Sequence, residues 1–191
     1  MSNTRSPEAL VKRYGTRDPF AIARELDIPV HMLNYPDSAL PGLTCIALNR
    51  PSIFINEAYF QKLQEEDPLY TEDAARDDIL QVCAHELGHA VLHRAQLRKS
   101  AIREYEIFNV RSQLEEEANQ FAAGIRIDTR QMTELFNSEL SLLQVASAMH
   151  VNINLLIYKL DAFRRAGYQL PYIPRNNFMG GIHGPGSSEW G

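Results

Sequence analysis

Hydrophobic and polar residues follow patterns that predict a helix, then a short β-rich stretch, then further helices. Asp18 and Pro19 precede apolar residues at helical spacing, which is typical of a capped helix start. After Pro29, three short runs of β-favouring residues are separated by turn residues. The pattern therefore predicts a small antiparallel meander whose strands are residues 28–33, 43–48 and 53–55.

The rest of the chain has mostly helical periodicity. Asn56 could cap a predicted helix that runs to about Glu66, and further helices are predicted from about Glu72 to Arg98 and from about Ser112 to Ile127. The segment from Thr129 to about Gly167 has a helical pattern throughout. Residues 171–191 are dense in Gly, Pro, Asn and Ser, so we expect an irregular tail.

Length and composition favour one folded unit with short additions. The 191 residues are 45% hydrophobic and 23% charged, which argues against a disordered, collagen-like or coiled-coil chain. We expect a catalytic domain at residues 5–128, a C-terminal helical subdomain at 129–170 packed on it, and the tail at 171–191.

Charge and cysteine content restrict the partners and the compartment. A formal net charge of −5 gives no general attraction to phosphate backbones or anionic lipid, so direct nucleic-acid binding is not the first expectation. Cys45 and Cys83 lie far apart and form no disulfide pattern. No segment has the pattern of a secretory signal or a membrane span. We therefore expect a cytoplasmic protein without membrane contact.

The residues His85-Glu86-Leu87-Gly88-His89 form an H-E-x-x-H motif inside the longest predicted helix. One helical turn separates His85 from His89, so both imidazoles can reach a single Zn²⁺ ion. Glu86 projects beside them, where a carboxylate can accept a proton from metal-activated water and pass it to the leaving amine. The surrounding helix is apolar on nearly all sides, and buried polar groups of this kind need partners. The motif therefore predicts a catalytic zinc site.

A catalytic zinc usually has three protein ligands, so a third must come from elsewhere. The next predicted helix opens with three glutamates, and Glu115 shares its face with Ala118, Ala122 and Asn119. Small residues let two helices approach closely, and Asn119 could hydrogen-bond a ligating histidine. We therefore predict Glu115 as the third ligand.

Two other interpretations bear on this assignment. Ser112 and Glu115 also match a capping box, in which the glutamate only closes the start of the helix. In that case Glu117 becomes the next candidate ligand. The extended metzincin pattern is excluded, because Leu92 and Ala95 stand where it requires glycine and histidine.

At this point the sequence resembles the ImmA/IrrE family of gluzincin-type metallopeptidases. The resemblance covers about residues 15–130 and rests on HELGHAVLH at 85–93, EEEANQFAA at 115–123, and DPFAIARELDIPV at 18–30 ahead of a strand ending at Asn56. It implies a predominantly helical α+β fold with a small three-stranded sheet. After residue 123 the sequence departs from the apolar run and proline that are frequent in the family.

The resemblance also implies chemistry and a substrate. Zinc would be held by His85, His89 and Glu115, with Glu86 as the catalytic glutamate. The expected substrate is a helix-turn-helix transcriptional repressor, whose cleavage would release genes of a mobile element or a stress response.

Further residues leave alternatives open. His93 continues the i, i+4 series. It would either hydrogen-bond a ligand or face the substrate, or, as the favoured interpretation, be a packed or capping histidine. Tyr105, His93 and Arg103 are candidates for stabilising the oxyanion, and the sequence does not choose among them.

Two rival functions remain. Residues 142–152 and the following helix imitate a helix-turn-helix, with Lys159, Arg164 and Arg165 as possible DNA contacts. No wider basic stripe accompanies them, so packing on the catalytic helices or docking of a partner is favoured over DNA binding. In the second rival, the zinc site serves sensing or partner binding without proteolysis.

Overall fold

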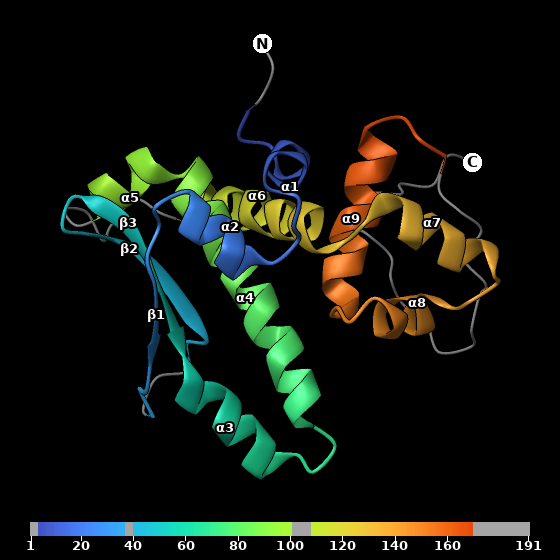
Figure 1. Cartoon of the computed structure of the whole chain (residues 1–191), viewed down its shortest axis with the longest axis horizontal. Coiled ribbons are helices and arrows are strands. Elements are labelled where there is room, and N and C mark those ends of the chain that lie inside the picture. The colour runs from blue at the N-terminus through green and yellow to red at the C-terminus, as the bar shows by residue number, and fades with distance from the viewer. Residues whose placement is uncertain (1–3, 37–39, 101–107, 170–191) are drawn as a thin grey trace, which may run out of the picture.

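The structure is a computed structural model, and it describes residues 4–36, 40–100 and 108–169. Within this part of the chain, helices dominate and a single three-stranded sheet lies on one side of them (Figure 1). The fold is therefore α+β and mostly helical, as predicted. The predicted tail at 171–191 lies outside the described residues, and the domain boundary at 128 stays a prediction.

The described elements follow in chain order. They are α1 (Pro7–Tyr14), α2 (Pro19–Glu25), β1 (Val30–Leu33), β2 (Gly42–Ala47), β3 (Arg50–Asn56), α3 (Glu57–Glu66), α4 (Glu72–Leu92), α5 (Arg94–Ser100), α6 (Phe108–Arg126), α7 (Thr129–Asn137), α8 (Leu142–Ala148) and α9 (Ile153–Arg165).

Side-chain caps start the first two helices. The Asp18 carboxylate accepts a hydrogen bond from the Phe20 amide at 2.9 Å, which confirms the predicted start of α2. The helix α1 was not predicted, although Ser6 caps it, Pro7 is its first residue and Gly15 ends it in the left-handed conformation. These three residues are the signal that the sequence analysis overlooked.

The predicted antiparallel meander is wrong, because the sheet is mixed and its strand order is β1-β3-β2. β1 pairs with β3 in parallel, and β2 pairs with β3 antiparallel. β3 also begins earlier than predicted, with Pro51 paired to Ile46. The pairing with β1 starts only at Ile53, so β3 has a neighbour on one side at Pro51 and the missing proline N–H is tolerated there.

Asn56 has a different role from the predicted one. α3 begins directly after it, as expected, but the side chain makes no capping hydrogen bond. It instead accepts a hydrogen bond from the Tyr35 amide and donates to the carbonyl oxygens of Tyr35 and Leu40. Asn56 thereby joins the segment that leaves β1 to the segment that enters β2.

The long helix predicted to reach Arg98 ends six residues earlier. α4 stops at Leu92, and His93 leaves the helical conformation with φ −110° and ψ 22° before α5 begins at Arg94. The His93 ring is buried and hydrogen-bonded on both sides, to His89 and to Glu117. We attribute the break to the contacts of this ring.

The position of α4 organises the fold. One side of α4 contacts β2 and β3, and another contacts α6, against which α9 packs in turn (Figure 1). Ile53 and Ile55 of the sheet, Leu87 of α4 and Ile125 of α6 are fully buried. Among the described residues, no helix has both the length and the apolar character required to span a membrane.

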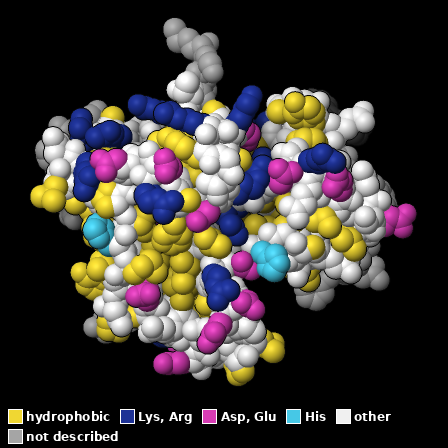
Figure 2. Space-filling model, in the orientation of Figure 1, with side chains coloured by type: hydrophobic (Ala, Val, Ile, Leu, Met, Phe, Trp, Pro, Cys, Tyr) yellow, Lys and Arg dark blue, Asp and Glu magenta, His cyan; other side chains and the backbone are white. Residues whose placement is uncertain are grey.

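The three basic residues considered for DNA contact all make ion pairs within the protein. Their partners are Glu8 for Lys159, Asp161 for Arg164, and Asp161 together with Glu116 for Arg165. On the face shown in Figure 2, the C-terminal helices carry acidic as well as basic side chains and no continuous basic stripe. These observations favour packing of α9 on the catalytic helices.

The turn between β2 and β3 provides a test of backbone strain. Leu48 and Asn49 have φ of 48° and 64°, and the Leu48 side chain is 95% exposed. Asparagine tolerates this conformation better than leucine, so we expect Leu48→Asn to raise the free energy of unfolding by about 1 kcal/mol in urea titrations. Leu69→Asn is the control, because Leu69 is exposed without a positive φ. Equal effects of the two substitutions would contradict the strain.

Candidate metal centre

Two histidines of α4 and one glutamate of α6 converge at one point. The Nε2 atoms of His85 and His89 lie 3.1 Å apart. The Glu115 carboxylate oxygens lie 3.2 Å from the Nε2 atom of His85 and 3.6 Å from that of His89. The three residues together form a group that could hold a metal ion.

These separations fit a tetrahedral metal site. Ligand atoms bonded to zinc at ~2.0–2.1 Å with tetrahedral angles lie about 3.3–3.4 Å from one another. The three separations lie on either side of this value, and the two that involve Glu115 belong to different oxygens of its carboxylate. Both histidine side chains are largely buried, whereas that of Glu115 is 48% exposed, so the group is reachable from solvent on the α6 side.

The protonation of the histidines also suits a metal. The Nδ1 atom of His85 donates to the Asn119 amide oxygen at 2.9 Å, which leaves its Nε2 lone pair free. Burial, followed by the nearby His85 ring, lowers the pKa of His89 to about 4, so this ring is neutral at neutral pH. Two imidazoles and a carboxylate facing one another form an environment that a divalent cation stabilises.

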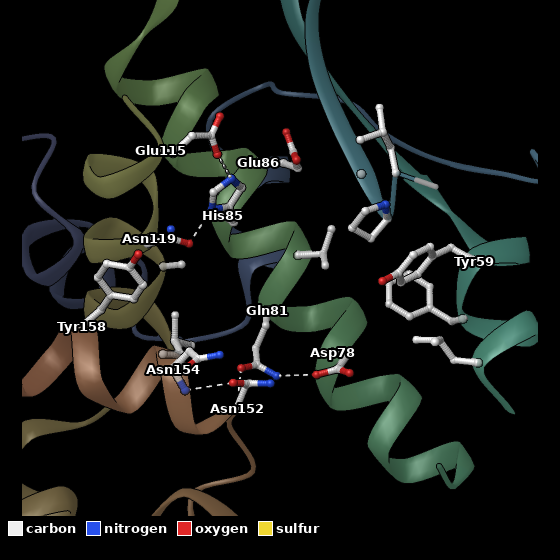
Figure 3. Close-up of a pocket in the computed structure, with 18 residues that line it drawn as sticks. Tyr59, Asp78, Gln81, His85, Glu86, Glu115, Asn119, Asn152, Asn154 and Tyr158 are labelled. Atoms are coloured by element: carbon white, nitrogen blue, oxygen red, sulfur yellow. Dashed lines mark hydrogen bonds and ion pairs between the residues drawn. The ribbon is translucent and has the colours of Figure 1, made fainter. Parts of the chain in front are cut away.

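Glu86 lies between His85 and the strands, as Figure 3 shows. The side chain is buried, and the Thr44 hydroxyl of β2 lies 2.7 Å from its Oε2 atom and 2.9 Å from its main-chain oxygen. Burial raises the pKa of the Glu86 carboxyl group, while the hydrogen bond from Thr44 acts in the opposite direction. The predicted base therefore has a fixed orientation and an environment that favours accepting a proton.

Two glycines allow the elements around the site to come close. A Cβ atom on Gly88 would lie 3.1 Å from the Ala118 Cα atom of α6, and one on Gly42 would lie 2.6 Å from a Val82 methyl group of α4. Ala118, one of the two small residues predicted to bring the helices together, therefore lies at their contact. This contact is what allows Glu115 to reach the histidines.

The capping-box alternative for Glu115 is wrong. α6 begins at Phe108, so Ser112 lies inside the helix and Glu115 is in its second turn. Glu117, the alternative ligand, does not join the histidine pair, because its carboxylate lies 3.0 Å from the Nε2 atom of His93.

A cleft of about 480 Å³ opens beside the group. α3 contributes Tyr59, Phe60 and Leu63 to one wall, and α9 contributes Leu155 and Tyr158 to the opposite wall (Figure 3). The charged residues among its described lining are Asp78, Glu86 and Glu115, apart from the titratable His85. The cleft is therefore apolar at its walls and acidic where it is charged.

An amide connects the two sides of the cleft. Gln81 of α4 accepts a hydrogen bond from the Asn152 amide at 2.6 Å and donates to Asp78 at 2.9 Å. Asn152 caps α9, so this contact fixes the start of that helix against α4. Sequence reasoning missed Thr44 and Gln81, because their partners lie 42 and 71 residues away in the chain.

The remaining candidates are placed as follows. His93 lies behind His89 with both ring nitrogens hydrogen-bonded, so it offers no free donor to an oxyanion in the cleft. Tyr105, Arg103 and His183 lie outside the described residues. Cys83 of α4 is fully buried. His31 stacks on Phe54, and His150 pairs with Asp77.

Comparison with known proteins gives one match. The family model for the IrrE N-terminal-like domain, a peptidase family, matches residues 70–161, which include the four predicted site residues. No curated protein and no solved structure is significantly similar to the chain.

The helix contact at Gly88 can be tested by stability. Alanine is otherwise favoured over glycine inside a helix by about 1 kcal/mol. Because the added methyl group would press on the α6 backbone, we expect Gly88→Ala instead to lower the free energy of unfolding by about 1–2 kcal/mol in urea titrations. A stability gain would contradict the close approach.

Proposed function

The chain belongs to the ImmA/IrrE family of peptidases, and we propose that it is a zinc-dependent endopeptidase. In this proposal His85, His89 and Glu115 hold the metal and Glu86 is the catalytic residue. The observation that carries it is the convergence of two imidazole nitrogens and a carboxylate beside an open cleft that also contains a buried glutamate.

Zinc is proposed because two histidines and one glutamate are a ligand set of catalytic zinc sites, which keep one further position open. When bound, zinc supplies a Lewis acid that polarises the scissile carbonyl group and lowers the pKa of water to about 7. The position of Glu86 next to the ligands, with its side chain at the cleft, suits it to receive the proton of that water.

Thr44 supports Glu86 in both of its protonation states. When Glu86 is a carboxylate, the Thr44 hydroxyl donates to its Oε2 atom. When Glu86 carries a proton, its own O–H can donate to the Thr44 oxygen, and the hydroxyl can turn to the main-chain oxygen of Glu86. The carboxyl group is thus held in place while it acts first as base and then as acid.

The cleft suits an extended peptide segment. Apolar side chains of both the α3 wall and the α9 wall can contact a substrate segment that lies in the cleft. The acidic residues disfavour substrate segments with Asp or Glu beside that bond, because like charges repel in a partly buried site. Apolar and neutral segments are therefore the proposed substrate class.

We propose a helix-turn-helix repressor as the protein substrate, whose cleavage derepresses mobile-element or stress-response genes. The support is the family resemblance, and a DNA-bound repressor places the reaction in the cytoplasm. The rival is a zinc-containing sensor or regulator that binds a partner or DNA without proteolysis. The ion pairs of Lys159, Arg164 and Arg165 favour the peptidase over DNA binding.

Two matched Glu→Gln substitutions separate catalysis from metal binding. The purified protein is incubated with the repressor encoded next to its gene, with and without chelator, and the fragments are measured. We expect Glu86→Gln to bind one zinc but to cleave about 10²–10⁴-fold more slowly, and Glu115→Gln to lose zinc affinity as well. Cleavage that survives both chelator and Glu86→Gln would refute the proposal, and biological activity retained by Glu86→Gln would favour the sensor.

Substitution of Thr44 tests the support of the base. Thr44→Val removes the hydroxyl at nearly constant volume, and a hydrogen bond to a charged group contributes about 1.5–3 kcal/mol. We therefore expect kcat to fall roughly 10–100-fold with KM and zinc content unchanged. Thr44→Ser keeps the hydroxyl and should lose far less. Equal losses in the two variants would show that packing, and not the hydrogen bond, is responsible.

A further inference from the structure

His93 is buried and lies directly behind His89, one of the proposed ligands. The His93 side chain is 2% exposed, and its Nδ1 atom lies 2.9 Å from the Nδ1 atom of His89. Its Nε2 atom lies 3.0 Å from the Oε2 atom of Glu117 on α6. A continuous row of hydrogen bonds therefore runs from Glu117 through His93 to the back of His89.

The direction of these hydrogen bonds follows from Glu117, the outermost residue of the row. The side chain of Glu117 is 42% exposed, and its other oxygen accepts a hydrogen bond from Gln113 at 2.9 Å. An ionised carboxylate only accepts, so the proton between Glu117 and His93 belongs to the Nε2 atom of His93. The Nδ1 atom of a neutral His93 then carries a lone pair.

That lone pair determines the state of the next ring. Two nitrogen atoms 2.9 Å apart need one proton between them, and His93 has none to give from Nδ1. His89 must donate from its own Nδ1 atom, which leaves its Nε2 atom unprotonated. This is the nitrogen that faces His85 and Glu115.

We propose that Glu117 and His93 are positioning residues that fix the ring orientation and the tautomer of His89, and thereby set the affinity of the site for a divalent metal ion. The proposal rests on the proposed function in taking His89 as a ligand. His85 is oriented differently, by the neutral amide of Asn119. The two ligand histidines thus have different hydrogen-bond partners. His89, whose partner His93 is itself bonded to a carboxylate, is the stronger electron donor.

A purely structural role explains less of the geometry. His93 ends α4, and its backbone amide donates to the His89 carbonyl oxygen at 2.9 Å, but any residue with that backbone conformation can do this. A buried imidazole needs partners at both nitrogens in any role, but packing alone does not require one of these partners to be the back of a proposed ligand. The side-chain contacts are therefore the feature that the experiment addresses.

We call the row of hydrogen bonds from Glu117 through His93 to His89 the relay. It is tested by the zinc affinity of the full chain, measured by competition with a chromophoric chelator. His93→Phe keeps an aromatic ring of similar size and removes both hydrogen bonds. We expect it to weaken Zn²⁺ binding about 10–100-fold, as is usual when the hydrogen-bond partner of a ligating histidine is removed. Glu117→Gln leaves the ring in place but removes the charge, and it should weaken binding by a smaller factor, about tenfold.

Glu116→Gln is the matched control. It makes the same change of charge one residue away, and the Glu116 carboxylate contacts Gln120 and Arg165 instead of a histidine. We expect its zinc affinity to equal that of the native protein. If Glu116→Gln weakens binding as much as Glu117→Gln does, net charge is responsible and the relay is refuted.

The double variant tests whether Glu117 acts through His93. In a relay, adding Glu117→Gln to His93→Phe should cause no further loss of zinc affinity. Losses that multiply would show that the two residues act independently and would overturn the proposal.

The tautomer can be observed directly in metal-free protein. Nitrogen-15 chemical shifts of the imidazoles should show the His89 proton on Nδ1 in the native protein and in Glu116→Gln, and a shift of population toward the other tautomer in His93→Phe. A proton on Nε2 of His89 in the native protein would contradict the relay even if His93→Phe fails to fold.

The outcomes also separate this inference from the proposed function. If the native protein binds no zinc at His85, His89 and Glu115, the proposed function itself fails. If the native protein binds zinc and cleaves its substrate while His93→Phe and Glu117→Gln bind zinc normally, only the relay fails.

Discussion

The contact between α4 and α6 at Gly88 and Ala118 is the constraint on which the site depends. The two histidines come from one helix, and helical spacing alone brings them together. The third oxygen comes from another helix, and it reaches the histidines only because no side chain separates the two backbones at this point. The same approach brings Asn119 to His85 and Glu117 to His93, which lies behind His89, so one packing contact sets both the proposed ligands and their orientation.

The opposite side of α4 contributes the other half of the chemistry. β2 passes close enough for Gly42 to touch the helix and for Thr44 to hold Glu86. The proposed ligands are therefore supported from α6, while the proposed base is supported from the sheet. Each group has its own partner, so the orientation of Glu86 does not depend on the hydrogen bonds that orient the histidines.

The C-terminal helices pack on this arrangement, which is the interpretation that their sequence favoured over DNA binding. Their pattern suggested a helix-turn-helix, yet Leu156 of α9 is fully buried and its basic residues are neutralised by nearby carboxylates. Through Gln81 and Asn152, the start of α9 is fixed to the catalytic helix and forms a wall of the cleft. The segment is therefore placed to contact a substrate in the proposed reaction.

The sequence by itself determined what depends on local spacing: most helices, the two histidines one turn apart, and the face of α6 that carries Glu115 and Asn119. It did not determine which segments far apart in the chain pair with one another. The parallel pairing of β1 with β3, the contact of His93 with Glu117 and the hydrogen bond from Thr44 to Glu86 all join residues far apart in the chain. Helical periodicity is set by neighbouring residues, whereas strand order and buried hydrogen bonds are settled only when the whole core packs.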